Sequence, residues 1–251
     1  MPAERFGAPD ISRPPGISPT LDFVPDADGQ PRRPAAVLWD LDGTMLDSEK
    51  VWWEVEQDLF AENGGQWTEE FARSLTGSDL YDSAITMIEA FGRADLDPHV
   101  LVTDMVRRVE LRLLERVEFL PGVERLLAEI EAGGVPMAIV TASYRPLVDA
   151  LLTQTDVHFS ALVTGERVTR GKPDPEPYLT AAELLGVDPG DCVAIEDSVP
   201  GAASASAAGC HVLIIPHAVL PPAGNRRTFA ESLVDVDLEM LSRLVAVPAD
   251  R

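Results

Sequence analysis

Apolar residues follow two different patterns along this chain, and the change falls near residue 118. After it, short apolar runs typical of strands alternate with stretches whose apolar residues recur at helical spacing. Strands are predicted over 135–140, 161–164, 192–195 and 211–215, and helices over 123–132, 146–154, 176–185 and 201–208, with one more helix within 229–245. This βαβ alternation predicts a parallel sheet with right-handed crossovers.

Before residue 118 the main pattern is helical. In the segment 50–118, apolar residues such as Val51, Val55 and Leu59 recur at helical spacing, and no strand pattern interrupts them. We expect a small antiparallel helical bundle here. Residues 1–34 hold 8 of the 21 prolines and show little periodicity, which predicts a disordered N-terminal extension.

The apolar run at 35–39 predicts one more strand, buried on both faces, and it leads into Asp40-Leu41-Asp42-Gly43. If the chain stays extended, the side chains of Asp40 and Asp42 share a face, with Cα atoms about 7 Å apart. Two carboxylates this close repel each other unless one takes up a proton or a cation is present. Mg²⁺ prefers oxygen ligands and often holds substrate phosphates as well. Taken alone, the same residues also fit an Asp-rich turn.

Polar residues also follow two of the later strands. The segment 141–143 comes after one of them, and the acidic pair Glu196-Asp197 comes after another. Between them, Lys172 lies in the rigid turn Gly-Lys-Pro-Asp-Pro and is one of only two lysines in the chain. Because ligands in open α/β sheets bind beyond the carboxyl ends of the strands, these residues are candidates for a single site.

In this order, the four motifs resemble those of the haloacid dehalogenase-like hydrolase superfamily. The resemblance covers roughly residues 35 to 245. It favours the branch with a helical cap inserted after the first motif, which includes β-phosphoglucomutase-like and phosphoglycolate phosphatase-like enzymes. It implies an α/β fold in which a Rossmann-like parallel-sheet core, residues 35–49 and 119–251, carries an inserted helical-bundle cap at 50–118.

The resemblance assigns Asp40 as the nucleophile. Attack of its carboxylate on phosphorus would form an aspartyl-phosphate and divide one difficult step into two. Asp42 is then the general acid for the leaving oxygen and the general base for water. Haloalkanoate-dehalogenating relatives lack this second aspartate, so its presence favours phosphoryl chemistry. Lys172 is expected to neutralise both Asp40 and the phosphoryl group.

The resemblance also implies a cofactor. Mg²⁺ is expected to bind Asp40, Asp197 and the backbone carbonyl of Asp42. Glu196 would either bind the metal through water or pair with Lys172. Four acids around one centre require a cation on charge grounds alone.

Candidate substrate contacts come from the same resemblance. The hydroxyl of Thr141 is expected to hold a phosphoryl oxygen, as is Lys172. Further contacts are expected where the loop enters the next helix, whose N–H groups favour an anion, and these are Ala142, Ser143 and Arg145. Arg145 equally fits a solvated surface residue. In the cap, the segment 75–80 resembles the loop that reaches over the active site, which makes Gly77 and Ser78 expected substrate contacts.

Two departures bear on the reaction. Mutase-like relatives carry an arginine in that cap loop and a histidine early in the first cap helix, where this chain has Leu80 and Trp52. Since a mutase must hold a second phosphate and exclude water, we expect a phosphatase acting on a small phosphorylated metabolite. A phosphosugar mutase of the β-phosphoglucomutase type and a non-catalytic binding protein on the same fold stay open. A phosphonatase-like enzyme would need a cap lysine, and only Lys50 is available.

The formal net charge of −22 bears on partners and location. It argues against nucleic acid, whose phosphates need Lys and Arg, and against an anionic membrane surface. No apolar run approaches the roughly 18 residues of a membrane span, and no signal peptide is evident. The two cysteines, Cys192 and Cys210, lack the spacing of a zinc site. We therefore expect a cytoplasmic protein, either a monomer or a weak homodimer.

Overall fold

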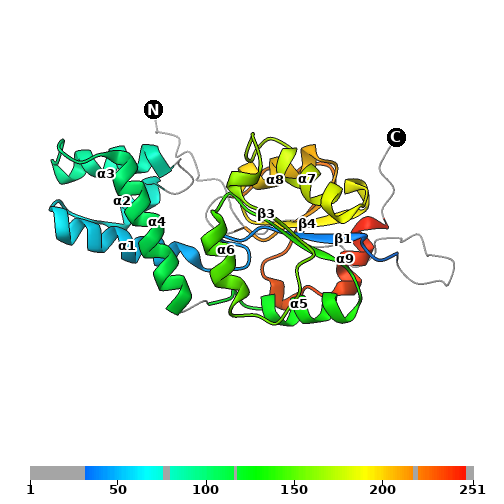
Figure 1. Cartoon of the computed structure of the whole chain (residues 1–251). Coiled ribbons are helices and arrows are strands. Elements are labelled where there is room, and N and C mark those ends of the chain that lie inside the picture. Colours follow the sequence, from blue (N-terminus) through cyan, green and yellow to red (C-terminus); the bar gives the residue numbers. More distant parts are fainter. Residues whose placement is uncertain (1–31, 76–79, 116–117, 217–219, 247–251) are drawn as a thin grey trace, which may run out of the picture.

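The computed structural model describes residues 32–75, 80–115, 118–216 and 220–246. The extension expected at 1–34 lies almost wholly outside these described residues, and so do Gly77 and Ser78. The chain forms two lobes, one of helices alone and one built on a sheet (Figure 1). Within the described ranges, no helix combines the length and apolar character needed to cross a membrane.

The larger lobe is built on a parallel sheet with the strand order β3-β2-β1-β4-β5-β6 (Figure 1). Its strands are β1 (Ala36–Trp39), β2 (Met137–Val140), β3 (Ala161–Val163), β4 (Cys192–Glu196), β5 (His211–Ile214) and β6 (Arg227–Phe229). The predicted Rossmann-like parallel sheet is confirmed. Because β1 lies between β2 and β4, the candidate residues at the ends of these three strands are brought to one edge of the sheet.

The sequence did not predict β6. Its three residues, Arg-Thr-Phe, are half-buried and form no apolar run. They join the sheet through backbone pairing with β5, in which Leu213 is the partner of Thr228. A strand defined by backbone pairing at a sheet edge leaves little hydrophobic signal in the sequence.

Helices cover both faces of the sheet (Figure 1). One face carries α5 (Val123–Ala132) and α9 (Leu238–Val245), and the other carries α7 (Glu176–Leu185) and α8 (Val199–Ala207). Short 3-10 turns occur at η1 (Gly165–Arg167), η2 (Pro189–Asp191) and η3 (Leu233–Asp235). Along β1, Val37 and Trp39 pack into the first core and Ala36 and Leu38 into the second, because successive strand side chains point to opposite faces.

The smaller lobe consists of α1 (Ser48–Asn63), α2 (Glu69–Leu75), α3 (Leu80–Phe91) and α4 (Pro98–Glu115) (Figure 1). The helical content expected for 50–118 is therefore present. These helices enclose a core of their own, in which Val55, Met87 and Met105 are almost fully buried. Helical spacing predicted Val55 and Leu59 as buried positions of α1, because one stripe of that helix faces this core.

Helix α6 (Arg145–Leu152) lies between the two lobes (Figure 1). Its Leu147 and Ala150 pack into the core of the helical lobe, whereas Val148 and Leu151 pack into the core under the sheet. A helix with two apolar faces is expected where it is covered on two sides. The sequence pattern predicted the helix but not its packing against both lobes.

The two connections between the lobes lie side by side. Leu46, just before α1, forms an antiparallel bridge with Phe119, just after α4. The N–H of Leu120 donates to the carbonyl of Met45 at 2.8 Å. The chain therefore enters and leaves the helical lobe through one short backbone contact.

Candidate active site

Asp40 follows β1 directly, and its side chain is buried. Its N–H donates to the carbonyl of Ile195 at 3.0 Å, which fixes the backbone against β4. Oδ1 accepts a hydrogen bond from Lys172, whereas the buried Oδ2 has no hydrogen-bond partner among the described residues. Burial raises the pKa of Asp40, and the charge of Lys172 opposes that shift. The unpartnered oxygen is suited to attack an electrophile or to bind a cation.

Lys172 lies between two acids. Its ammonium nitrogen is 2.5 Å from Oδ1 of Asp40 and 2.6 Å from Oε1 of Glu196. Burial lowers the pKa of Lys172, but Asp40 and then Glu196 more than offset this and the net shift is upward. Of the two roles expected for Glu196, the structure shows the pairing with Lys172. A single positive charge thus faces two carboxylates.

Three acids form a group whose geometry could hold a metal ion. Carboxylate oxygens of Asp40, Glu196 and Asp197 lie within 4.8 Å of one another. Burial, followed by the charge of Glu196, raises the pKa of Asp197 to about 7. A cation would relieve this repulsion, and the unpartnered Oδ2 of Asp40 could serve as a ligand. Carboxylate oxygens are the donors that Mg²⁺ prefers, so the residues present fit this ion.

Gly43 permits the close approach of Asp197 to the loop after β1. Its φ of 84° lies in the left-handed region, and a Cβ placed there would be 2.3 Å from Oδ2 of Asp197. Glycine alone meets both conditions without strain. The sequence showed Gly43 only as part of a turn, because its contact with Asp197 depends on β1 and β4 being neighbours.

The carboxylate of Asp42 faces the end of β2 and is not part of the three-acid group. Its Oδ2 accepts hydrogen bonds from the hydroxyl of Ser143 and, at 3.4 Å, from the hydroxyl of Thr141. The N–H of Ser143 donates to Oγ1 of Thr141 at 2.9 Å. The structure therefore brings the expected general acid into contact with two expected phosphoryl ligands.

A cavity of about 320 Å³ adjoins these groups. Thr141, Ala142 and Lys172 are among the residues that line it, together with Tyr144 and Glu166. This cavity has room for a small substrate beside the ammonium and the hydroxyl.

Arg145 is not among the residues that line this cavity. Its guanidinium pairs with Asp149 at 2.7 Å, and both side chains are more than half exposed. Its backbone N–H donates to the carboxylate of Glu166 at 3.1 Å. This geometry supports the surface interpretation of the Arg145 side chain.

Two groups that hold Glu196 were not found by sequence reasoning. The hydroxyl of Tyr178, in α7, donates to Oε1 at 2.5 Å, and the hydroxyl of Ser198 donates to Oε2 at 3.1 Å. In the sequence, Tyr178 reads as one of the apolar positions of a helix. Its place shortly after the Lys172 turn was the available signal.

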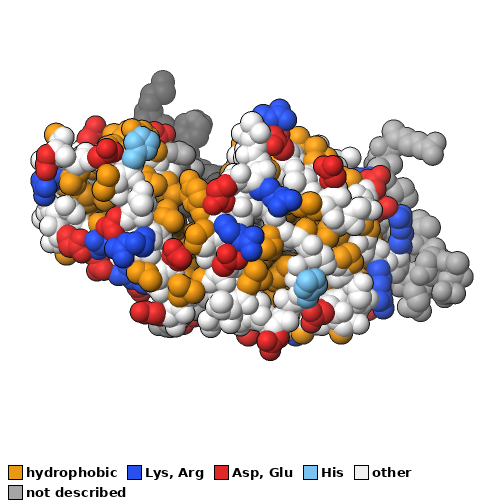
Figure 2. Space-filling model, viewed as in Figure 1, with side chains coloured by type: hydrophobic (Ala, Val, Ile, Leu, Met, Phe, Trp, Pro, Cys, Tyr) orange, Lys and Arg blue, Asp and Glu red, His pale blue; other side chains and the backbone are white. Residues whose placement is uncertain are grey.

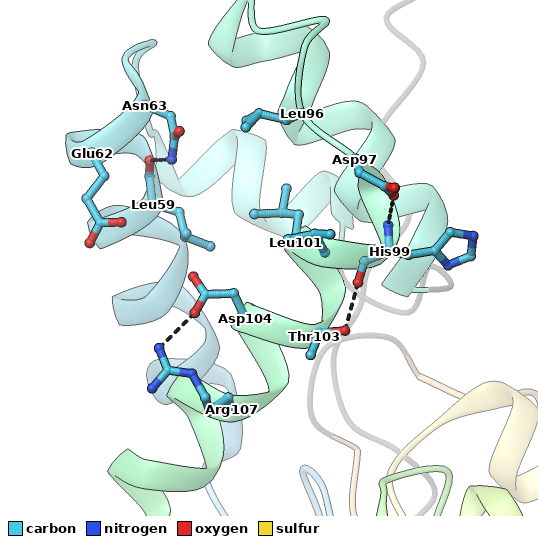
Figure 3. A pocket seen from close by; sticks show the side chains of 11 residues that line it. Leu59, Glu62, Asn63, Leu96, Asp97, His99, Leu101, Thr103, Asp104 and Arg107 are labelled. Atoms are coloured by element: carbon cyan, nitrogen blue, oxygen red, sulfur yellow. Dashed lines mark hydrogen bonds and ion pairs between the residues drawn. The ribbon is translucent and has the colours of Figure 1, made fainter.

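A second cavity, of about 600 Å³, lies wholly in the helical lobe. Figure 3 shows residues that line it, among them Glu62 and Asn63 at the end of α1 and Leu101 and Asp104 of α4. Arg107 on its rim is paired with Asp104 at 2.9 Å. It is the larger of these two cavities, but the three-acid group of Asp40, Glu196 and Asp197 does not line it. That group makes the sheet edge the candidate active site.

The surface charge does not itself attract an anion. On the face shown in Figure 2, basic side chains lie among acidic ones over both lobes. Several arginines are paired, for example Arg108 with Glu62 at 2.6 Å. An anionic substrate would therefore depend on local donors such as Lys172 and backbone N–H groups.

Comparison with known proteins agrees with this geometry. The model of the haloacid dehalogenase-like hydrolase family matches residues 37–215. The chain belongs to this family. The expected haloacid dehalogenase-like hydrolase, with helices inserted after the first motif, is thereby confirmed.

Relatives of this haloacid dehalogenase-like hydrolase include named phosphatases. Hexitol phosphatase A from Escherichia coli (strain K12) is 35% identical over 212 residues, which cover 82% of this chain and 92% of that protein. The bifunctional riboflavin kinase/FMN phosphatase from Arabidopsis thaliana is 30% identical over 82% of this chain, and the match spans 55% of that longer protein. The crystal structure of CbbY from Rhodobacter sphaeroides in complex with phosphate has a TM-score of 0.70 and 26% identity, covering 80% of this chain and 96% of that one.

Proposed function

We propose that this chain is a Mg²⁺-dependent phosphatase that hydrolyses a small phosphorylated metabolite through an aspartyl-phosphate on Asp40. The observation that carries the proposal is the state of the Asp40 carboxylate. One oxygen accepts a hydrogen bond from Lys172, and the other is buried with no hydrogen-bond partner among the described residues. Asp40 also belongs to the group of three acids with Glu196 and Asp197. The naming of relatives such as hexitol phosphatase A supports the same reaction class.

In the first proposed step, a carboxylate oxygen of Asp40 attacks phosphorus while the bond to the ester oxygen breaks. Lys172 offsets the charge gathered on the phosphoryl oxygens, and the hydroxyl of Thr141 donates to one of them. Asp42, in its protonated form, gives its proton to the leaving alkoxide.

In the second step, Asp42 takes a proton from water as that water attacks the phosphorus of the aspartyl-phosphate. The bond between phosphorus and Asp40 breaks, which releases inorganic phosphate and restores the carboxylate. One water is consumed, and Asp42 returns to the protonation state in which it began.

Asp40, Asp197 and the backbone carbonyl of Asp42 would hold the Mg²⁺, with Glu196 nearby as the partner of Lys172. When bound, the ion would supply positive charge that reduces the repulsion between the phosphoryl group and the attacking carboxylate. We also propose that the helices in 50–118 act as a cap over this edge and select the substrate.

The test is a phosphate-release assay with purified chain, Mg²⁺ and a panel of hexitol phosphates, hexose phosphates, phosphoglycolate and nucleotides. We expect turnover of at least one small phosphomonoester, abolished by D40N. Hydrolysis of nothing on the panel, with the protein folded and Mg²⁺ present, would contradict the proposal. Activity that instead requires a catalytic bisphosphate and releases no phosphate would indicate a mutase.

A further inference from the structure

The donors around Glu196 fix its carboxylate completely. Oε1 accepts from Lys172 and from the hydroxyl of Tyr178, and Oε2 accepts from the hydroxyl of Ser198. The side chain is fully buried. A carboxylate with both oxygens engaged in this way has one position available to it.

The first turn of α8 packs against the other side of the same carboxylate. A Cβ at Gly201 would lie 2.0 Å from Oε2 of Glu196 and 2.1 Å from Oε1. The N–H of Gly201 donates to the hydroxyl of Ser198 at 3.1 Å, which in turn holds Oε2. Glu196 therefore cannot move toward α8, and its position on the opposite side is set by Lys172 and Tyr178.

Tyr178 contacts both members of the adjacent ion pair. Its hydroxyl is 2.5 Å from Glu196, and the ammonium of Lys172 lies 5.4 Å from the centre of its ring. The residue is fully buried, and it belongs to the helix that begins directly after the turn bearing Lys172. The ring thus supports the lysine while the hydroxyl holds its counter-ion.

We propose that Tyr178 is a positioning residue for the proposed reaction, on which this inference rests. Its hydroxyl takes part of the charge of Glu196, so that Lys172 is shared between Glu196 and Asp40 rather than drawn to Glu196 alone. Without that hydroxyl, Glu196 is a stronger acceptor for the ammonium, and Lys172 shifts away from Asp40. The lysine would then lie off the position in which it meets the phosphoryl group.

The first test is Y178F, which keeps the ring and removes the hydroxyl. We expect kcat to fall about 10- to 100-fold with KM nearly unchanged, because misplacing one catalytic group by about 1 Å has effects of this size. The matched control is S242A, which removes a buried hydroxyl that donates to the carbonyl of Leu238 far along the chain in α9. We expect S242A to keep wild-type kcat.

A double-mutant cycle separates positioning from general loosening. If Tyr178 acts through Glu196, Y178F should change kcat by less than about threefold in an E196Q background, since coupled residues are not additive. A double variant whose loss in kcat equals the product of the two single losses would overturn the proposal. So would a wild-type kcat in Y178F alone.

A third readout does not depend on activity. The chain has two lysines, Lys50 and Lys172, so ¹⁵N-lysine labelling gives two ammonium signals. We expect Y178F to shift or broaden the signal of Lys172 while leaving that of Lys50 in place, and S242A to change neither. An unmoved Lys172 signal overturns the proposal even if no substrate is ever found, which separates this failure from failure of the proposed function.

If Y178F does not fold, replacement of all tyrosines by 3-fluorotyrosine, which alters the donor strength of the hydroxyl, must shift the Lys172 signal instead.

Discussion

The ammonium of Lys172 lies 2.5 Å from Oδ1 of Asp40, although 132 residues separate the two in the chain. The same ammonium is 2.6 Å from Glu196 at the end of β4. One cation shared by two buried carboxylates, with Asp197 beside them, leaves the site short of positive charge. That shortage is the physical reason to expect a metal ion at this edge of the sheet.

Removing the nucleophile is the most direct test of the reaction. We expect D40N to lower turnover at least about 10³-fold, because only binding and electrostatic effects would remain. D95N is the matched control, since Asp95 is an exposed acid of the helical lobe paired with Arg93. Near-wild-type turnover in D40N would refute the assignment of Asp40.

Metal removal tests the acidic group. We expect exhaustive chelation to abolish activity and Mg²⁺ to restore it, with Ca²⁺ a poor substitute because its larger, looser ligand shell disturbs the geometry of attack. Calorimetric titration of Mg²⁺ into the chelated protein should show binding that D197N weakens. Full activity after chelation would show that no metal is required.

The close approach of Gly43 to Asp197 can be tested with a pair of matched variants. Gly43 and Gly92 both have positive φ, but a Cβ at Gly92 would meet nothing within 4 Å. We expect G43A and G92A each to lose about 1 kcal/mol of unfolding free energy from backbone strain, with a larger loss in G43A from the collision. Mg²⁺ affinity and turnover should fall only in G43A. Equal behaviour of the two variants would show that the Gly43–Asp197 contact does not matter.

His211 should make stability depend on pH. Burial, and after it the charge of Arg226, lowers the pKa of His211 to about 4, while Asp191 acts in the opposite direction. Between pH 6.5 and 4 the unfolded chain then binds a proton that the folded chain does not, so unfolding free energy falls as the pH drops through this window. The contribution is at most about 3 kcal/mol.

Denaturant titrations at pH 7 and pH 4.5 measure this effect. H211Q should lose less stability between the two pH values than the wild type does, even if it is less stable at pH 7. H158Q, which changes an exposed histidine, is the control and should follow the wild type. An unchanged pH dependence in H211Q would contradict the prediction.

The sequence by itself determined the elements that hydrophobic periodicity can specify. The run at 35–39 is apolar at every position because β1 is covered on both faces, and the acids after it mark the point where the strand leaves the core. The motif order also identified the family. Turn chemistry placed Lys172 in a short rigid segment rather than on a solvated helix face, and its ammonium is buried against two acids.

Only the tertiary structure decided which of these groups meet, and how. The strand order puts Asp42 against Thr141 and Ser143 and puts Gly43 against Asp197. Neither contact has a local signature, because its partners follow different strands. The contact of Tyr178 with Glu196 was also hidden from the sequence. A buried aromatic residue on a helix has the same hydrophobic spacing whether or not its hydroxyl donates to a carboxylate. Edge strand β6 and the two-sided packing of α6 likewise depend on neighbours far away in the chain. Periodicity records whether a side chain is buried, and long-range packing decides what it is buried against.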